Sequence, residues 1–241
     1  MQDSKPCPTP LASGSKLSAY DGAPLSYARE YRSIVGALQY LTLTRPDICY
    51  AVNQVCQFMH AFTTIHLQAV KRILRYLKGS LGRGLTITPG LLTTFFAFSD
   101  ADWAGCPNSR RSTTGFCVFL GKTLLTWVSK KQPTLSRSSA EAEYKALAIT
   151  TSELLWLSYL LRDLAANPVF HARSKHIEVD YHFVRELVVA GKLLIRLVRS
   201  NNQVADIFTK GLPEPAFHHF RGKLLSPACP SLERLIGYTN E

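Results

Sequence analysis

The apolar pattern of this chain changes from helical to alternating spacing near residue 92, and that change constrains the fold more than any other feature. "TTFFAFSD" predicts a strand, and "TGFCVFLG" and "TLLTWVSKK" predict a hairpin across the short Gly121-Lys122 connection. The later spacing predicts a long helix, a second helical stretch, a short strand and a last helix, at residues 138–164, 174–191, 193–199 and 203–210. This order of elements predicts a mixed α/β sheet domain.

Three further segments surround this sheet domain, which we place at residues 91–225. Residues 1–25 are rich in Pro, Ser and Gly, a composition typical of a flexible tether. Residues 26–90 carry three apolar patterns at helical spacing, the last of which ends at Gly79. Residues 226–241 remain as a C-terminal tail.

The third helical pattern carries four basic residues along one side: Lys71, Arg72, Arg75 and Lys78. A solvated helix face explains them, and a face that follows the phosphates of a nucleic acid explains them equally well. The chain as a whole has 28 basic and 17 acidic residues, for a net charge of +11. Such a surplus favours a polyanionic partner, above all nucleic acid, although a basic protein without such a partner would have the same charge.

The cysteines and the apolar segments indicate where the protein resides. The six cysteines form no C-x-x-C pair, which favours free thiols in a reducing compartment over a disulfide framework or a zinc site. No segment reaches the roughly 18 uncharged apolar residues that a membrane span needs. The N-terminus also lacks the apolar core of a signal peptide. We expect an intracellular protein of the cytoplasm or nucleus, neither secreted nor bound to a membrane.

Carboxylates gather at special positions of the predicted elements. Asp100 and Asp102 end the first strand. In the long helix, Glu143 falls within about 40° of three leucines on the apolar stripe, at 100° per residue. Glu141 lies on the opposite side, where it can cap the helix with Ser138 and pair with Lys145. Glu143 is therefore the acid that needs a special reason for its position.

The last helix contributes Asp206, for which Lys210 one turn later offers an ordinary ion-pair partner. A second interpretation is that Asp100, Glu143 and Asp206 converge. Carboxylate oxygens suit a hard cation such as Mg²⁺, and two such ions about 4 Å apart support in-line displacement at phosphorus. Asp100 would bridge the two ions, with Glu143 and Asp206 on either side, while Asp102 is either a further ligand or a surface residue.

Several long motifs resemble one known family. "FSDADWAG", "RRSTTGFCVFLG", "TWVSKKQPTLSRSSAEAEYKALA" and "NQVADIFTKGLP" resemble the ribonuclease H domain at the C-terminus of copia-type retrotransposon Pol polyproteins. "YRSIVGALQYLTLTRPDICYAVNQVCQFM" and "KRILRYLKG" are similar to the reverse transcriptase connection segment that precedes that domain, which places the connection segment at residues 26–90. The resemblance covers nearly all of residues 3–225.

The resemblance implies a ribonuclease H-like fold that hydrolyses the RNA strand of an RNA–DNA hybrid with Mg²⁺ or Mn²⁺. By position it assigns Asp100, Glu143 and Asp206 as both catalytic residues and metal ligands. It also implies, as partners, a nucleic acid and the rest of a Pol polyprotein. Arg110, Arg111, Lys130, Lys131 and Arg137 are the candidate phosphate contacts near this site, although solvation would explain each one alone.

The sequence departs from the family pattern in two ways. It has no Tyr-x-Asp-Asp motif, which excludes DNA synthesis by this chain. The fourth strand that usually follows the long helix, together with its terminal Asp, is absent, because "LLRDL" runs directly into "AANPVFH" near residues 164–167. Asp163 lies beside this junction but is a poor substitute, since it ends a helix. We therefore expect an impaired nuclease and a weakened sheet.

Two other functions remain open at this point. One is a catalytically inactive remnant that still binds nucleic acid through its basic residues. The other is an adaptor whose helical segment binds another protein, which rests only on amphipathic helices that core packing would explain equally well.

Overall fold

A three-stranded antiparallel sheet forms the centre of the molecule. The computed structural model describes residues 4–26, 28–88, 95–166 and 180–225, without the side chains of residues 28, 162–166, 180–183 and 185. The strands are β1 (Phe95–Asp102), β2 (Thr113–Leu120) and β3 (Thr123–Lys131), in the order β1-β2-β3. The predicted hairpin is confirmed, and its turn uses Gly121 at φ +59°, where glycine has no steric penalty. The predicted tail lies outside the described residues.

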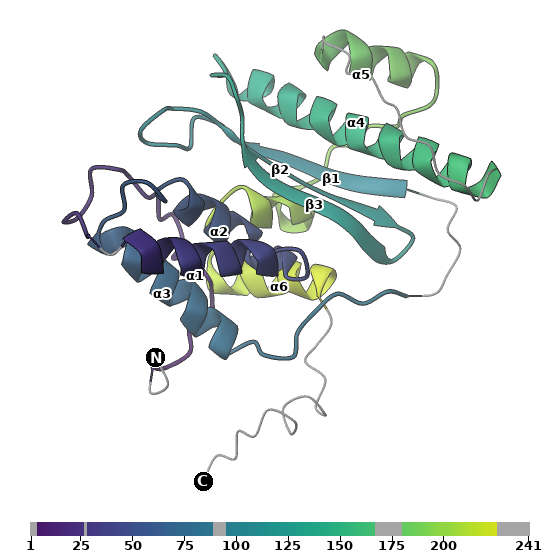
Figure 1. Ribbon diagram of the computed structural model, residues 1–241. Coiled ribbons are helices and arrows are strands. Elements are labelled where there is room, and N and C mark those ends of the chain that lie inside the picture. Colours follow the sequence, from purple (N-terminus) through teal and green to yellow (C-terminus); the bar gives the residue numbers. More distant parts are fainter. Residues whose placement is uncertain (1–3, 27, 89–94, 167–179, 226–241) are drawn as a thin grey trace.

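The two faces of the sheet are covered by different layers of helices (Figure 1). Helix α4 (Ser139–Ala166) crosses one face, where Phe116 and Val118 of β2 pack with Leu157. The other face carries Cys117 and Phe119, which join the core of the helical segment. Because successive strand residues point to opposite faces, the alternation within "FCVF" divides β2 between these two cores. All eight residues of β2 are buried as a result.

The N-terminal half forms the helical layer that the spacing predicts. It contains α1 (Ala28–Leu41), the short η1 (Pro46–Ile48), α2 (Cys49–Cys56) and α3 (Thr64–Lys78). The side chain of Thr63 caps α3 together with His66, and α3 ends at Gly79. None of the described helices is both long and apolar enough to cross a membrane. One core cluster unites this layer with Cys117 and Phe119 of the sheet and with Phe208.

The segment that the sequence predicts as a tether lies packed against the helical layer. Residues 4–26 contain no helix, but Leu11 and Leu17 are buried in the core. The basic residues of α3 hold this segment. Arg75 Nε donates to the carbonyl of Lys5 at 2.6 Å, Arg72 Nη2 donates to Thr9 Oγ1 at 2.9 Å, and Lys78 Nζ donates to the carbonyl of Ser4 at 3.1 Å. Three of the four basic residues on this face therefore contact the protein's own chain.

The predicted strand at 193–199 does not form. These residues have no regular structure, and Leu194 and Leu197 are 73% and 100% exposed. No described residue pairs with the free edge of β1. Side chains satisfy two backbone groups of β1 instead, since Gln203 Nε2 donates to the carbonyl of Ser99 at 3.0 Å and Glu143 accepts from the amide of Ala101. The prediction of a parallel strand was therefore wrong for the described residues: residues 193–199 do not pair with β1, whose outer edge has no strand partner among them.

The remaining elements lie on either side of this segment. Helix α5 (Asp180–Val189) contacts α4, and the short η2 (Ser200–Asn202) follows the irregular stretch. The predicted last helix at 203–210 is a shorter 3₁₀ helix, η3 (Val204–Phe208), which packs on β2. Helix α6 (Glu214–Leu224) begins after Pro213 and buries Phe217 and Phe220 in the helical core.

A buried ion pair anchors the turn between α1 and α2. Arg45 binds both carboxylate oxygens of Asp47 through Nε at 2.9 Å and Nη2 at 2.8 Å, and it donates to the carbonyl of Ser80 at 3.1 Å. The hydroxyl of Tyr76 also donates to Asp47. The side chains of Arg45 and Asp47 are 7% and 0% exposed, so neither charge has access to water as an alternative partner.

We expect Asp47→Ala to lower the free energy of unfolding by about 3–5 kcal/mol, because it leaves the Arg45 charge buried without its partner. Urea denaturation followed by circular dichroism measures the change. The matched control is Glu141→Gln, which removes a carboxylate from the solvent-exposed pair with Lys145 and should have little effect. Equal losses in the two variants would contradict the assigned role of Asp47.

Candidate functional site

Three carboxylates from distant parts of the chain meet at one end of the sheet. Asp100 lies near the end of β1, Glu143 in the first turns of α4, and Asp206 within η3. Their charges influence one another: burial and then Asp100 raise the pKa of Glu143, and burial and then Asp100 also raise the pKa of Asp206. The structure therefore brings together the three acids that the sequence selects.

Lys210 lies between two of these acids. Its Nζ is 3.0 Å from Asp206 Oδ1 and 3.5 Å from Asp100 Oδ2. Burial alone would lower the pKa of Lys210, but Asp100 and Asp206 together raise it. The predicted pairing of Asp206 with Lys210 is thus present, and the same ammonium also pairs with Asp100. Thr209 adds a hydroxyl that donates to Asp100 Oδ2.

Gly115 allows η3 to approach the sheet closely enough for these contacts. It lies opposite Asp100 in the β1–β2 register. A Cβ atom at Gly115 would lie 2.6 Å from Thr209 Cγ2 and 2.7 Å from Phe208 Cβ, which is closer than such atoms can pack. The absence of a side chain at this position therefore brings Asp206, Thr209 and Lys210 within reach of Asp100.

Glu143 differs from the other two acids in its surroundings. Burial and the charge of Asp100 raise its pKa to about 7, partly offset by a hydrogen bond from the Ala101 amide and by Lys210. The prediction that Glu143 faces the core is only partly correct. The residue as a whole is exposed to solvent, but its carboxyl group lies against β1 at the Ala101 amide. Glu141 behaves as predicted: its backbone amide donates to the capping hydroxyl of Ser138, and its carboxylate pairs with Lys145 at 2.9 Å.

The two other candidate acids have different surroundings. Burial raises the pKa of Asp102, partly offset by Lys16 and Lys210, and the Asp102 carboxylate lies directly over Gly105. Asp102 therefore faces the loop after β1 and the N-terminal segment that carries Lys16. Asp163 falls within α4, but its side chain is outside the described part of the chain.

The implied divalent metal does not fit this arrangement as it stands. Among the residues that the structure describes, no group of three or more His, Cys, Asp or Glu side chains could hold a metal ion. The donor atoms are the hard oxygens that Mg²⁺ prefers, but the ammonium of Lys210 already supplies the positive charge to Asp100 and Asp206. What the site offers instead is a carboxyl group, Glu143, that changes protonation near neutral pH beside this ion-paired set.

The candidate phosphate contacts lie at the same end of the sheet. The strand register places Lys130 and Lys131 beside Thr114 and Thr113, which pair in turn with Ala101 and Asp102. Four of the five basic residues are exposed to solvent: Arg110, Arg111, Lys130 and Arg137. Lys131 is half-buried, and its Nζ contacts Cys106 Sγ at 3.0 Å and Ser109 Oγ at 3.4 Å, so it also stabilises the loop after β1.

Four contributors to this site were not identified from the sequence. Thr209 and the second ion pair of Lys210 depend on how η3 packs, which no local pattern reveals. Gly115 carried a signal of a different kind, because a glycine within the strand "TGFCVFLG" often marks a close approach of another backbone. Lys16 reaches Asp102 only because the N-terminal segment is packed against the domain.

Known relatives match this chain over most of its length. The Pol polyprotein from transposon RE1 of Arabidopsis thaliana is 46% identical over 93% of this chain, and that from transposon RE2 is 42% identical over 98%. The Pol polyprotein from transposon TNT 1-94 of Nicotiana tabacum is 35% identical over 90%. The chain belongs to the copia-type retrotransposon Pol family.

This member of the Pol family corresponds to only part of its relatives. It spans 17% of the length of the RE1 polyprotein and 18% of the lengths of the RE2 and TNT 1-94 polyproteins. No protein-family model matches the chain, and no solved structure matches it significantly. The match to the Pol family therefore rests on the sequences of these relatives.

The close contact at Gly115 leads to a test of how this Pol segment builds its site. We expect Gly115→Ala to lower the free energy of unfolding by about 1–3 kcal/mol, because the added methyl group overpacks the contact with η3. Chemical denaturation measures the loss. Gly36→Ala in α1 is the matched control: its Cβ would meet nothing within 4 Å, so the better helix former should stabilise slightly. Equal tolerance of the two substitutions would contradict this account of Gly115.

The raised pKa of Glu143 leads to a test by pH. The pKa of Glu143 is about 7 in the folded chain and 4.5 in its ordinary state. The protonated carboxyl group therefore stabilises the fold at low pH, and this contribution is lost as the pH rises through about 7. Relative to the wild type, Glu143→Gln should therefore gain thermal stability between pH 4 and pH 8. Because the residue is exposed, we expect a gain of only about 2–4 °C.

Asp100, Asp206 and Lys210 also act on Glu143, so the comparison needs a control for charge alone. Glu153→Gln removes a carboxylate farther along α4. The raised pKa would be contradicted if the melting temperatures of Glu143→Gln and the wild type differed by the same amount at pH 4 and pH 8. It would also be contradicted if Glu153→Gln showed the same trend with pH.

Proposed function

We propose that this chain is a retrotransposon-derived ribonuclease H-like domain that binds RNA–DNA hybrids and hydrolyses their RNA strand with impaired efficiency. The observation that carries the proposal is the meeting of Asp100, Glu143 and Asp206 at one end of the sheet. These acids come from a strand, a helix and a 3₁₀ helix that lie far apart in the sequence. The Pol relatives support the same origin, because each is a polyprotein from a transposon.

Binding to nucleic acid would use the exposed basic residues beside the acids. Arg110, Arg111, Lys130 and Arg137 point to solvent at this end of the sheet, and the whole chain carries a net charge of +11. Contacts of this kind hold the phosphate backbone without reading its sequence. They also make the affinity fall steeply as salt rises, because bound counterions are released from the nucleic acid.

Impairment follows from the ion pairs of Lys210. The proposed cofactor is Mg²⁺ or Mn²⁺, which could bind Asp100 and Asp206 only after the ammonium of Lys210 has moved away. From the resemblance we also expect that the acid ending the fourth strand of this family is missing from the sequence. Since changes around a metal site typically cost about 10–100-fold in affinity or activity, we expect weak metal binding and slow hydrolysis.

A second candidate function is a nucleic-acid-binding remnant without catalysis. Two observations on the described residues favour it: no group of acids close enough to hold a metal, and the compensation of two of the three acids by Lys210. In this case the carboxylates serve only as structural partners of Lys210 and Thr209.

A labelled RNA–DNA hybrid with increasing Mg²⁺ distinguishes the two functions. We expect the wild type to bind the hybrid and to cut its RNA strand slowly. Asp100→Asn should retain binding and lose cleavage. Lys210→Met should show a larger rise in melting temperature with Mg²⁺ than the wild type, because it frees Asp100 and Asp206. Binding without cleavage at any Mg²⁺ concentration would establish the second function, and loss of binding at low salt would reject both.

A further inference from the structure

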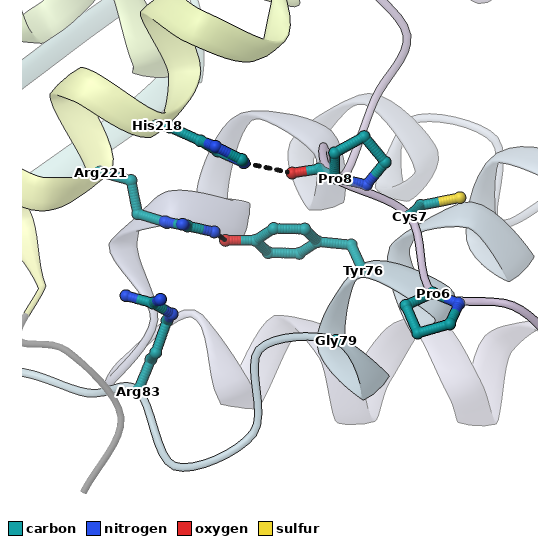
Figure 2. A pocket seen from close by; sticks show the side chains of 8 residues that line it. All are labelled: Pro6, Cys7, Pro8, Tyr76, Gly79, Arg83, His218 and Arg221. Atoms are coloured by element: carbon teal, nitrogen blue, oxygen red, sulfur yellow. Dashed lines mark hydrogen bonds between the residues drawn. The ribbon is translucent and has the colours of Figure 1, made fainter.

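A pocket separate from the acids lies between the N-terminal segment, α3 and α6 (Figure 2). Its volume is about 240 Å³, which is below the roughly 300–1,000 Å³ of pockets for whole drug-sized ligands and suits a small group. Its lining contains no carboxylate and consists of Pro6, Cys7, Pro8, Tyr76, Gly79, Arg83, His218 and Arg221. It uses none of the residues of the candidate active site.

Two guanidinium groups face this pocket. Arg221 extends from α6, and Arg83 belongs to the segment after α3; in Figure 2 both lie toward the hydroxyl end of Tyr76. Within the described ranges, neither Arg83 nor Arg221 pairs with a carboxylate. The pocket therefore has two positive charges and no anion of its own among the described residues.

Hydrogen bonds position the side chains around these charges. Arg221 Nη1 donates to the hydroxyl of Tyr76 at 3.3 Å, and that hydroxyl donates to the buried Asp47. His218 Nε2 lies 3.1 Å from the carbonyl of Pro8, and since a carbonyl only accepts, this nitrogen carries a proton. The base of the pocket is thus fixed by contacts to the core and to the N-terminal segment, which leaves Arg83 and the remaining N–H groups of Arg221 for a ligand.

We propose that this pocket binds a phosphate group. Guanidinium groups form paired, charge-assisted hydrogen bonds with phosphate oxygens, and two of them can surround one phosphate. The phosphate comes either from the end of a nucleotide or from the backbone of a strand. The choice of these two sources rests on the proposed function, whereas the recognition of phosphate rests on the pocket alone.

The test uses inorganic phosphate with the full chain in the absence of divalent metal, measured by isothermal titration calorimetry. We expect the wild type to bind phosphate, and we expect Arg83→Gln and Arg221→Gln each to weaken binding about tenfold or more, as the loss of one charged hydrogen bond predicts. Arg196→Gln is the matched control, because it removes an exposed guanidinium that does not line the pocket and should leave the affinity unchanged.

Two short oligonucleotides distinguish the sources of the phosphate. Tighter binding of a 5′-phosphorylated trinucleotide than of its 5′-hydroxyl form, lost in Arg83→Gln, would assign a terminal phosphate. Equal binding of both forms, weakened in Arg83→Gln, would assign a backbone phosphate. The proposal is overturned if inorganic phosphate does not bind, or if Arg83→Gln binds as tightly as the wild type.

Two design features keep the result interpretable. Arg221 donates a hydrogen bond to Tyr76, so the melting temperature of Arg221→Gln is measured alongside its phosphate affinity. Arg83 makes no hydrogen bond or ion pair with the described residues, so Arg83→Gln tests the pocket without that complication. Binding and cleavage of the RNA–DNA hybrid are measured in separate experiments, which test the three acids and not the pocket. Failure of the pocket would therefore leave the proposed nuclease standing, and failure of the nuclease would leave phosphate binding unchanged.

Discussion

The direct contact of η3 with β2 at Gly115 is the constraint on which the candidate site depends. Without a side chain at this position, the backbone of η3 lies against the sheet, and Asp206, Thr209 and Lys210 reach Asp100. The acids are therefore not placed by their own interactions, which are mainly repulsive. Packing places them, and Lys210 then compensates two of them. Glu143 remains apart from this ion-paired set, and its raised pKa reflects burial and the unfavourable field of Asp100.

The sequence was sufficient to predict the parts of the fold that local patterns determine. The strand pair around Gly121, the start of α4 at Ser138 and the end of α3 at Gly79 each carry a residue type whose backbone or capping chemistry marks that position. The three acids were identifiable for a related reason. A charged residue among apolar neighbours is costly, so its presence in a strand or helix marks a special position.

The errors arose where long-range contacts override local pattern. The segment at 193–199 has the apolar and β-branched residues of a strand, but a strand also needs a partner, and no described residue pairs with it or with the free edge of β1. The basic face of α3 was ambiguous because Arg72, Arg75 and Lys78 bind carbonyl and hydroxyl groups of the N-terminal segment. A Pro- and Ser-rich composition gives no indication of such a partner, since its contacts come from residues about 70 positions away.

The shared core of the helical layer and the sheet has a consequence for how such a protein can be divided. Family resemblance draws a border near residue 90, yet Cys117, Phe119 and Leu124 are buried in the same cluster as Val35, Val55 and Ile73. Trp127 Nε1 donates to the carbonyl of Thr42 at 3.1 Å across that border. The helical layer therefore shields one face of the sheet from solvent, so a cut near residue 90 would expose Cys117 and Phe119 to water.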